Sequence, residues 1–448
     1  MNWIQLLSDQ RPGERKKEQD THRSKFEQDY DRIIFSHPFR MLQDKTQVFP
    51  LPKHDFVHTR LTHSLEVASV GRSLGKLVGE KIIEKYPEIS RRGLTSSDIG
   101  AIVSAASLMH DLGNPPFGHA GENAISEFFK KSSVADKIAR LVTEKEWADL
   151  TNFEGNAQGF RLVNKQNYQG LKLTFATLGA FTKYPRESKI ESPVKGRKSQ
   201  KKYGFLQSNK NVFHELAEAM GLVNFGDADN AVWCRHPLAF LVEAADDICY
   251  NIIDLEDGAN LNLVSLEETK ELLVQIIGDS FREEKFAQIQ SKKEKISVLR
   301  AMAIHELINQ CVVKFMDLEE QLLKGEFDQA LTDHIPSANT LSKIQSISFL
   351  KIYKSTPVIE REIAGFEVLN GLLETFVPPV LNFKSEHKLS WHHDSLLKLL
   401  PIDVLHEINA HNSIYEALLL LMDFISGMTD SYALSLYRNI KGISLPSG

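Results

Sequence analysis

Apolar residues recur at helical spacing through most of this sequence, whereas the strict alternation typical of β-strands is scarce. Two segments begin with a capping-box pattern, Thr95 with Asp98 and Ser265 with Glu268, which marks the first turn of a helix. Pro237 suits a first helical turn, and the apolar residues after it recur at helical spacing: Leu238, Leu241, Val242, Ala245 and Cys249. The pattern therefore predicts an all-α fold.

The composition narrows the class of protein. Of the 448 residues, 42% are hydrophobic and 25% are charged, which is typical of a soluble globular chain. A net charge of −6 excludes a chain that is basic throughout, so any polyanion site must arise from local clustering. The three cysteines show no C-x-x-C spacing, and the longest apolar run, Ala417 to Met422, is far below the roughly 20 residues of a membrane span. With no signal peptide visible, we expect a cytoplasmic protein without a membrane partner.

Four side chains form a candidate metal site. His110 and Asp111 are adjacent, so an imidazole nitrogen and a carboxylate oxygen reach the same point in space. His63 begins an amphipathic segment, and Asp246 interrupts an apolar helical one, where a carboxylate is costly unless a cation or hydrogen-bond donors compensate it. Two imidazoles and two carboxylates suit Mn, Mg, Fe, Ni or Zn with water in the open positions.

Each of these residues also has a structural interpretation. His63 alone is more often a hydrogen-bonded helix histidine than a ligand, and Asp246 with Asp247 is compatible with a surface pair. His110 and Asp111 at a helix end are compatible with a C-terminal cap that benefits from the helix dipole. It is the combination, with each residue on a predicted helix, that favours a metal site.

The segment from Lys183 to Lys202 differs in character from the rest of the chain. It holds eight lysines and arginines against two acids, together with prolines, a glycine and serines. The simpler interpretation is a solvated surface loop, and the functional one is a loop that meets phosphates or nucleic acid. We divide the chain into an N-terminal extension (1–30), a core that carries the candidate metal site (31–259) and contains this basic loop (183–202), and a C-terminal helical region (260–448).

Between Arg32 and Gly258 the sequence resembles the HD-domain metal-dependent phosphohydrolases, and within them the deoxyguanosine triphosphate triphosphohydrolase family. The motifs that carry the resemblance stand in the family's order: RIIFSHPFRMLQDKTQVFP, HTRLTHSLEV, HDLGNPPFGHAGE, NFEGNAQG, TKYP and EAADDICYNIIDLED. The resemblance implies an HD-domain helical core and hydrolysis of a deoxynucleoside triphosphate, dGTP first, to the deoxynucleoside and inorganic triphosphate by water attack at the α-phosphorus.

The resemblance also implies roles for ten residues. The metal ligands are His63, His110, Asp111 and Asp246; the catalytic pair is His119 and Glu122; the phosphate is met by Arg60; and the sugar is met by Gln47, Tyr250 and Asp254. The expected cation is Mn²⁺ or Mg²⁺, with Fe, Ni, Zn and Co as the alternatives. The implied partners are the dNTP substrate, single-stranded DNA or an activating nucleotide, and further copies of the chain in a hexamer or tetramer.

Elementary geometry is compatible with these roles. Asp246, Tyr250 and Asp254 are four residues apart in turn, so they line one face of a helix over roughly 12 Å. One end of that face can hold a metal while the other meets a sugar. His119 and Glu122 are three apart, so if a helix begins after Gly118 the carboxylate can orient the imidazole. Whether His119 then protonates the 5′-oxygen or takes a proton from water stays open, as does a phosphate contact for Lys201 and Lys202.

Two other functions are compatible with the sequence. The first is a different HD-domain nucleotide phosphohydrolase, such as a nucleotidase or a phosphodiesterase, which the Gln47, Tyr250 and Asp254 set disfavours. The second is a nucleotide-sensing, nucleic-acid-binding regulator, for which the basic loop is the support.

Overall fold

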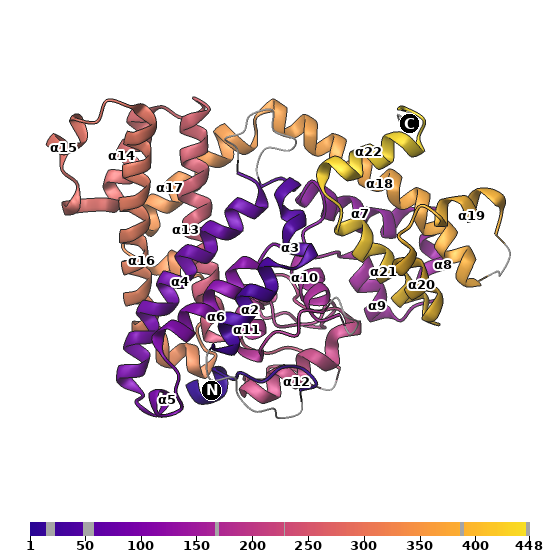
Figure 1. Ribbon diagram of the computed structural model, residues 1–448, viewed down its shortest axis with the longest axis horizontal. Coiled ribbons are helices and arrows are strands. Elements are labelled where there is room, and N and C mark those ends of the chain that lie inside the picture. The colour runs from indigo at the N-terminus through magenta and orange to yellow at the C-terminus, as the bar shows by residue number, and fades with distance from the viewer. Residues whose placement is uncertain (15–22, 48–57, 166–169, 228, 386–388, 445–448) are drawn as a thin grey trace.

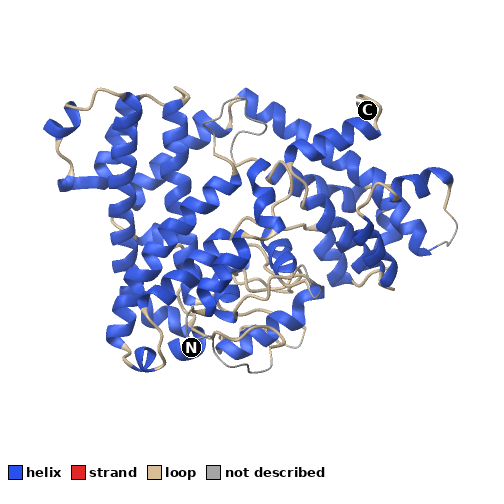
Figure 2. Ribbon diagram, in the orientation of Figure 1, coloured by secondary structure: helices blue, strands red, loops and turns tan. Residues whose placement is uncertain are grey.

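Helices are the main regular secondary structure in the described part of the chain. Figure 1 shows the computed structural model, which describes residues 1–14, 23–47, 58–165, 170–227, 229–385 and 389–444. Within these ranges there are isolated β-bridges but no β-strand, as Figure 2 also shows. The all-α prediction is confirmed.

The helices are joined by connections that range from a few residues to the long segment between α11 and α12. The first thirteen are α1 (Trp3–Leu6), α2 (Lys25–Ile34), α3 (His37–Met41), α4 (Arg60–Lys85), α5 (Glu88–Arg91), α6 (Ser96–Leu108), α7 (His119–Lys131), α8 (Ala135–Ala139), α9 (Glu144–Thr151), α10 (Gly155–Val163), α11 (Phe175–Phe181), α12 (Lys210–Met220) and α13 (Pro237–Asn260). The others are α14 (Leu266–Ile277), α15 (Glu283–Ala287), α16 (Lys292–Lys324), α17 (Ala338–Ser348), α18 (Thr356–Ser385), α19 (Trp391–Leu397), α20 (Ile402–Ala410), α21 (Ile414–Ser426) and α22 (Asp430–Ile440). Short 3₁₀ turns are η1 (Leu42–Asp44), η2 (Lys198–Gln200), η3 (Gln207–Asn209), η4 (Gly278–Ser280) and η5 (Leu331–His334), whereas η6 (Phe349–Tyr353) is a π-helical turn.

The helix starts match the sequence signals with one difference. Thr95 and Asp98 form both halves of the capping box at the start of α6. At α14 only half of the predicted box forms, because the Ser265 hydroxyl accepts from the Glu268 amide while the Glu268 carboxylate is drawn to Lys351 instead. Pro237 occupies the first turn of α13, as its fixed φ predicts.

A first hydrophobic core surrounds α4, α6 and α13, with α2, α11, α14 and α16 packed around them. Glycines let α4 and α6 approach closely: a Cβ at Gly75 would lie 2.9 Å from the carbonyl oxygen of Ile99, too close for any other residue. This core holds the helices that carry His63, Asp246 and the segment leading to His110 rigidly against one another.

A second hydrophobic core joins α7 and α9 to the C-terminal helices. Phe128 and Phe129 of α7 pack with apolar side chains of α18, α20, α21 and α22. Figure 1 shows α18, α21 and α22 beside α7, although more than two hundred residues separate them in sequence. We call α18 to α22 the C-terminal lobe.

The long helix α16 is the one single helix in the described ranges that has the length and hydropathy of a membrane span, and the bent pair α21 and α22 passes the same test together. The buried residues of α16, which include Leu299, Leu307 and Phe315, belong to the first core, and α16 packs on α13 and α14. This packing is that of a core helix.

Candidate metal and active site

Three predicted ligands come together at the centre of the first core. His63 lies one turn into α4, His110 follows the end of α6, and Asp246 lies in the middle of α13. Asp246 Oδ1 is 3.1 Å from His63 Nε2 and 3.6 Å from His110 Nε2, and one donor atom from each residue lies within 4.8 Å of the others. The neighbouring Asp247 turns away and accepts from the Thr332 hydroxyl at 2.6 Å.

The surroundings prepare these side chains to bind a cation. His110 Nδ1 lies 2.7 Å from the carbonyl oxygen of Ser107, which can only accept, so Nδ1 donates to it and the ring is oriented with Nε2 toward Asp246. Burial alone would raise the pKa of Asp246, but the charge of His110 and the hydrogen bond and charge of His63 outweigh burial and lower it. An ionised carboxylate and two imidazole nitrogens fit a divalent metal of the Mn, Fe or Zn type.

Asp111, the fourth predicted ligand, accepts hydrogen bonds from the side chains of its neighbours. Its Oδ2 accepts from Arg60 Nη1 at 2.5 Å and lies 3.5 Å from His110 Nε2, while Oδ1 accepts from the Asn114 amide at 2.5 Å. Burial opposes ionisation of Asp111, but the Arg60 guanidinium and the two histidines together lower its pKa. The three-residue ligand group does not include Asp111, whose coordination of a metal stays a prediction. Arg60 is thereby held at the edge of the group.

His119 and Glu122 form the predicted pair at the start of α7. Gly118, with φ of 56° and ψ of −126°, ends the turn, so α7 begins at His119. His119 Nδ1 lies 2.7 Å from Glu122 Oε2, and Glu122 Oε1 accepts from the Gly155 amide at 2.9 Å. The hydrogen bond to Glu122 raises the pKa of His119, whose side chain is 83% exposed. An anchored carboxylate thus holds an accessible imidazole.

The basic loop is largely neutralised by internal contacts. Arg186 donates to three backbone carbonyls, and Arg197 and Lys198 pair with acids that follow α16. Lys202 pairs with Glu154 at 3.0 Å. Burial raises the pKa of Glu122. The hydrogen bond with His119 and, after it, the charge of Lys202 outweigh burial and lower that pKa. These contacts favour the structural interpretation for most of the loop and leave Lys202 near His119 and Glu122.

The predicted sugar end lies further along α13. Asp254 is 4% exposed, and burial raises the pKa of its carboxyl to about 7. The Tyr353 hydroxyl donates to Asp254, and the Tyr353 ring stacks on Tyr250 with centroids 5.8 Å apart and planes 14° apart. Gln47 is half-buried, and its buried Oε1 makes no hydrogen bond within the described residues.

Sequence reasoning missed Tyr353, because no motif surrounds it and it lies 99 residues from Asp254. It ends the π-helical turn η6, a type of turn that is rare and often found at functional sites. The turn is visible only once the backbone is known.

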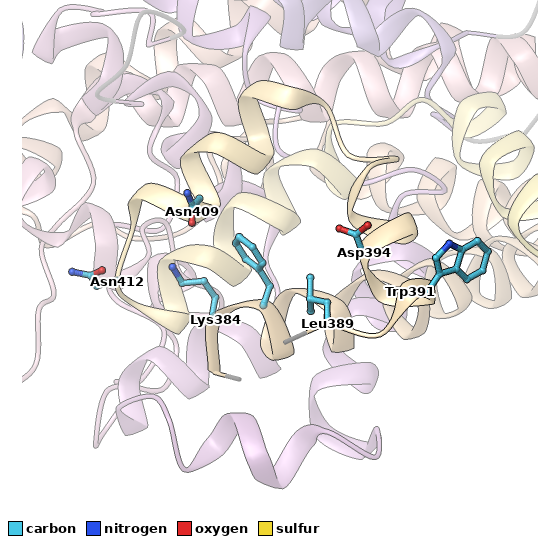
Figure 3. Close-up of a pocket in the computed structure, with 7 residues that line it drawn as sticks. Lys384, Leu389, Trp391, Asp394, Asn409 and Asn412 are labelled. Carbon is cyan, nitrogen blue, oxygen red and sulfur yellow. The ribbon is translucent and has the colours of Figure 1, made fainter. Parts of the chain in front are cut away.

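A separate pocket lies far from these residues in the C-terminal lobe. Its volume is about 600 Å³, and Figure 3 shows it between the end of α18, α19 and α20. The residues that line it are Phe383, Lys384, Leu389, Trp391, Asp394, Asn409 and Asn412, none of which is a predicted site residue.

Known proteins match this chain over nearly its whole length. The HD domain family model matches residues 60–158. The chain is 43% identical to a deoxyguanosinetriphosphate triphosphohydrolase-like protein of Synechocystis sp., over 99% of this chain and 100% of that protein. A protein of the same description in Pseudomonas aeruginosa is 38% identical over the full length of both. A deoxyguanosinetriphosphate triphosphohydrolase of Enterobacter sp. is 31% identical over 93% of this chain and 94% of its own length.

Proposed function

Because this chain belongs to the HD-domain deoxyguanosinetriphosphate triphosphohydrolase family and is a hydrolase, we propose that it cleaves deoxynucleoside triphosphates, dGTP preferentially, to the deoxynucleoside and inorganic triphosphate. The observation that carries the proposal is the convergence of His63, His110 and Asp246 beside Arg60. A divalent cation held by such a group, together with the Arg60 guanidinium, would neutralise phosphate charge at the place where a water attacks.

In the proposed reaction the oxygen of a water molecule bonds to the α-phosphorus and the bond from that phosphorus to the 5′-oxygen breaks. The 5′-oxygen leaves with a proton, and the three phosphates leave together. A divalent cation held by His63, His110 and Asp246, with Asp111 as the fourth predicted ligand, supplies positive charge at the reacting phosphate and lowers the pKa of water.

The side chains of this protein supply binding and proton transfer. The Arg60 guanidinium already contacts one carboxylate and can turn its planar fork to phosphate oxygens. His119 transfers the proton at the α-phosphate, either to the 5′-oxygen or from water, with Glu122 stabilising its charged form. Lys202 is the cation of the basic loop best placed for the outer phosphates, because its charge acts on both His119 and Glu122.

The far end of α13 selects the sugar. Asp254 and Gln47 receive the 3′-hydroxyl, which gives the unpaired Gln47 oxygen a donor. The stacked rings of Tyr250 and Tyr353 form the wall beside C2′, where a hydroxyl group would be crowded. This arrangement supports a preference for deoxyribose over ribose.

Family membership also supports proposals for the metal, the cellular location and the oligomeric state. We propose that the enzyme uses Mn²⁺ or Mg²⁺, acts in the cytoplasm on the deoxynucleotide pool, and assembles as a homo-oligomer. Single-stranded DNA or a second nucleotide is proposed as an activator. The three-part division of the chain at residues 30 and 259 stays a prediction.

Product analysis tests the proposal. The purified protein is incubated with each of the four dNTPs and with GTP, in Mn²⁺ and in Mg²⁺, and the products are followed by phosphorus NMR and chromatography. Deoxynucleoside and intact triphosphate are expected, with dGTP fastest and GTP slowest. Pyrophosphate or single phosphate would indicate another HD-domain phosphohydrolase. No turnover with every metal and activator, combined with salt-dependent DNA binding, would indicate the regulator instead. The Asp246→Asn variant controls for contaminating phosphatases.

A further inference from the structure

One carboxylate of the C-terminal lobe holds two segments of the active site together. Asp430, the first residue of α22, is 1% exposed. Its Oδ1 accepts from the backbone amide of Phe117 at 2.9 Å. Its Oδ2 accepts from the Thr46 amide at 3.0 Å and also from the Thr46 hydroxyl. Three donors from two segments therefore meet at a single buried side chain.

A buried lysine makes a second link between the same segments. Lys45 is 2% exposed, and its Nζ donates to the carbonyl oxygens of Asn114 at 2.7 Å and of Ser426, in α21, at 2.6 Å. Asn114 in turn holds Asp111 through its side-chain amide. Residues 45–46 and 114–117 are thus both fastened to residues 426–430 of the C-terminal lobe.

Each fastened segment adjoins an element that carries predicted site residues. The Lys45 carbonyl accepts from the Arg60 amide at 3.1 Å, and Thr46 forms an isolated bridge with Thr59, so the start of α4 rests on this segment. Gln47 is the next residue.

Phe117 has φ of 61°, a conformation that costs free energy for any residue other than glycine and persists only when its surroundings impose it. Its ring lies against α18, where a Cβ at Gly365 would come within 2.5 Å of it. Two residues after Phe117 stands His119.

We infer that Asp430 is a positioning residue that aligns the turn before His119 with the segment that supports Arg60 and Gln47. The catalytic role of His119 in this inference rests on the proposed function. The C-terminal lobe is thereby part of the active site: displacement of α22 moves the proton-transfer group relative to the ligand group without touching a metal ligand.

The test compares Asp430→Asn with Asp44→Asn in the full-length protein. The asparagine keeps the shape of Asp430 but turns one acceptor oxygen into a donor that faces the amide of Phe117 or Thr46. Asp44 is the matched control, because it joins the same two regions through Ser431 at the surface. We expect a fall in kcat of at least about 10-fold for Asp430→Asn and a smaller rise in KM for dGTP, with the Kd for Mn²⁺ alone within 3-fold of wild type. Asp44→Asn is expected to match wild type.

A folded Asp430→Asn protein with kcat within 2-fold of wild type would overturn the inference, as would an equal loss in Asp44→Asn. If Asp430→Asn does not fold at the assay temperature, Thr46→Val replaces it: a fall in kcat of about 3-fold is expected, and an unchanged kcat contradicts the inference.

A second readout does not depend on the reaction. Hydrogen exchange of the peptide that covers residues 112–119 is expected to speed up in Asp430→Asn and not in Asp44→Asn, and equal exchange contradicts the inference. If wild type releases triphosphate from none of the dNTPs, the proposed function fails, while the exchange measurement still decides whether Asp430 holds the turn.

Discussion

The two halves of the active site are built on different hydrophobic cores. The half that holds the ligand group, His63, His110 and Asp246, belongs to α4, α6 and α13 of the first core. The half that holds His119 and Glu122 belongs to α7, whose apolar face is buried by the C-terminal lobe in the second core. The ligand group is therefore positioned locally, whereas His119 and Glu122, the proposed proton-transfer pair, are positioned by residues that come at the other end of the chain.

The two halves should therefore lose their geometry through different substitutions. Side chains within one close-packed core keep their geometry unless the core itself is changed. The distance between the halves depends instead on the turn from residue 111 to 118 and on its contacts to Lys45 and Asp430. Substitutions of Asp246, His119, Tyr353 and Glu122 should affect the two halves differently, and the expected effects decrease in that order.

Loss of a ligand in the first half is expected to be the most severe change. Asp246→Asn should lower kcat/KM on the order of 10³-fold or more and weaken Mn²⁺ binding, because a neutral amide replaces the carboxylate that lies 3.1 Å from His63 Nε2 and 3.6 Å from His110 Nε2. Calorimetry with Mn²⁺ and steady-state kinetics with dGTP check this. Asp247→Asn is the matched neighbour and should retain most of the activity. Equal losses in both variants would contradict the ligand assignment.

Loss of the proton-transfer group in the second half should leave metal binding intact. His119→Gln is expected to lower kcat about 10²-fold or more while the Kd for Mn²⁺ stays that of wild type. His214→Gln serves as the control, because His214 and Glu218 form a similar pair on the surface of α12. If His119→Gln loses the metal as well, the two halves do not act separately and the comparison fails.

The stacked rings of Tyr250 and Tyr353 should affect the selectivity for deoxyribose over ribose more than the rate of hydrolysis. Tyr353→Ala removes the ring stacked on Tyr250 and is expected to reduce the preference for dGTP over GTP about 10-fold. Tyr353→Phe keeps the ring and loses only the hydroxyl, so it should retain most of that preference. The ratio of kcat/KM for the two nucleotides is the measurement, and an unchanged ratio in Tyr353→Ala would assign the discrimination elsewhere.

The smallest change is a shift in pH dependence. The hydrogen bond that His119 donates to the Glu122 carboxylate raises the pKa of His119, so Glu122→Gln is expected to lower that pKa. The limb of the kcat/KM profile that reports His119 should then move to lower pH. A falling alkaline limb that moves would make His119 the general acid, and a rising acid limb that moves would make it the general base. A profile that does not move would mean that His119 does not titrate in the reaction.

Local sequence patterns were sufficient to predict helices that carry the first half of the proposed site. The helix that begins at Pro237 and the capping box at Thr95 both form, so the patterns that depend on one or two turns of chain predict α6 and α13 correctly. A single helix then suffices to place Asp246, Tyr250 and Asp254 along α13, as their spacing requires.

The rest of the site depends on long-range packing. Asp430 contacts Thr46 across 384 positions of sequence, and Tyr353 contacts Asp254 across 99. An aspartate at the first turn of a helix is common for electrostatic reasons alone, so nothing in its neighbourhood distinguishes Asp430 from an ordinary capping residue. Its role follows only from how α22 packs against the turn before His119.

The most direct test of the account is hydrolysis of dGTP by the wild-type protein with Mn²⁺ in ¹⁸O-labelled water, with mass spectrometry of both products. The account predicts intact inorganic triphosphate that carries one ¹⁸O atom and deoxyguanosine that carries none, since water attacks the α-phosphorus. Label in deoxyguanosine would place the attack on carbon, and release of pyrophosphate or single phosphate would place it on another bond; either result would contradict the account.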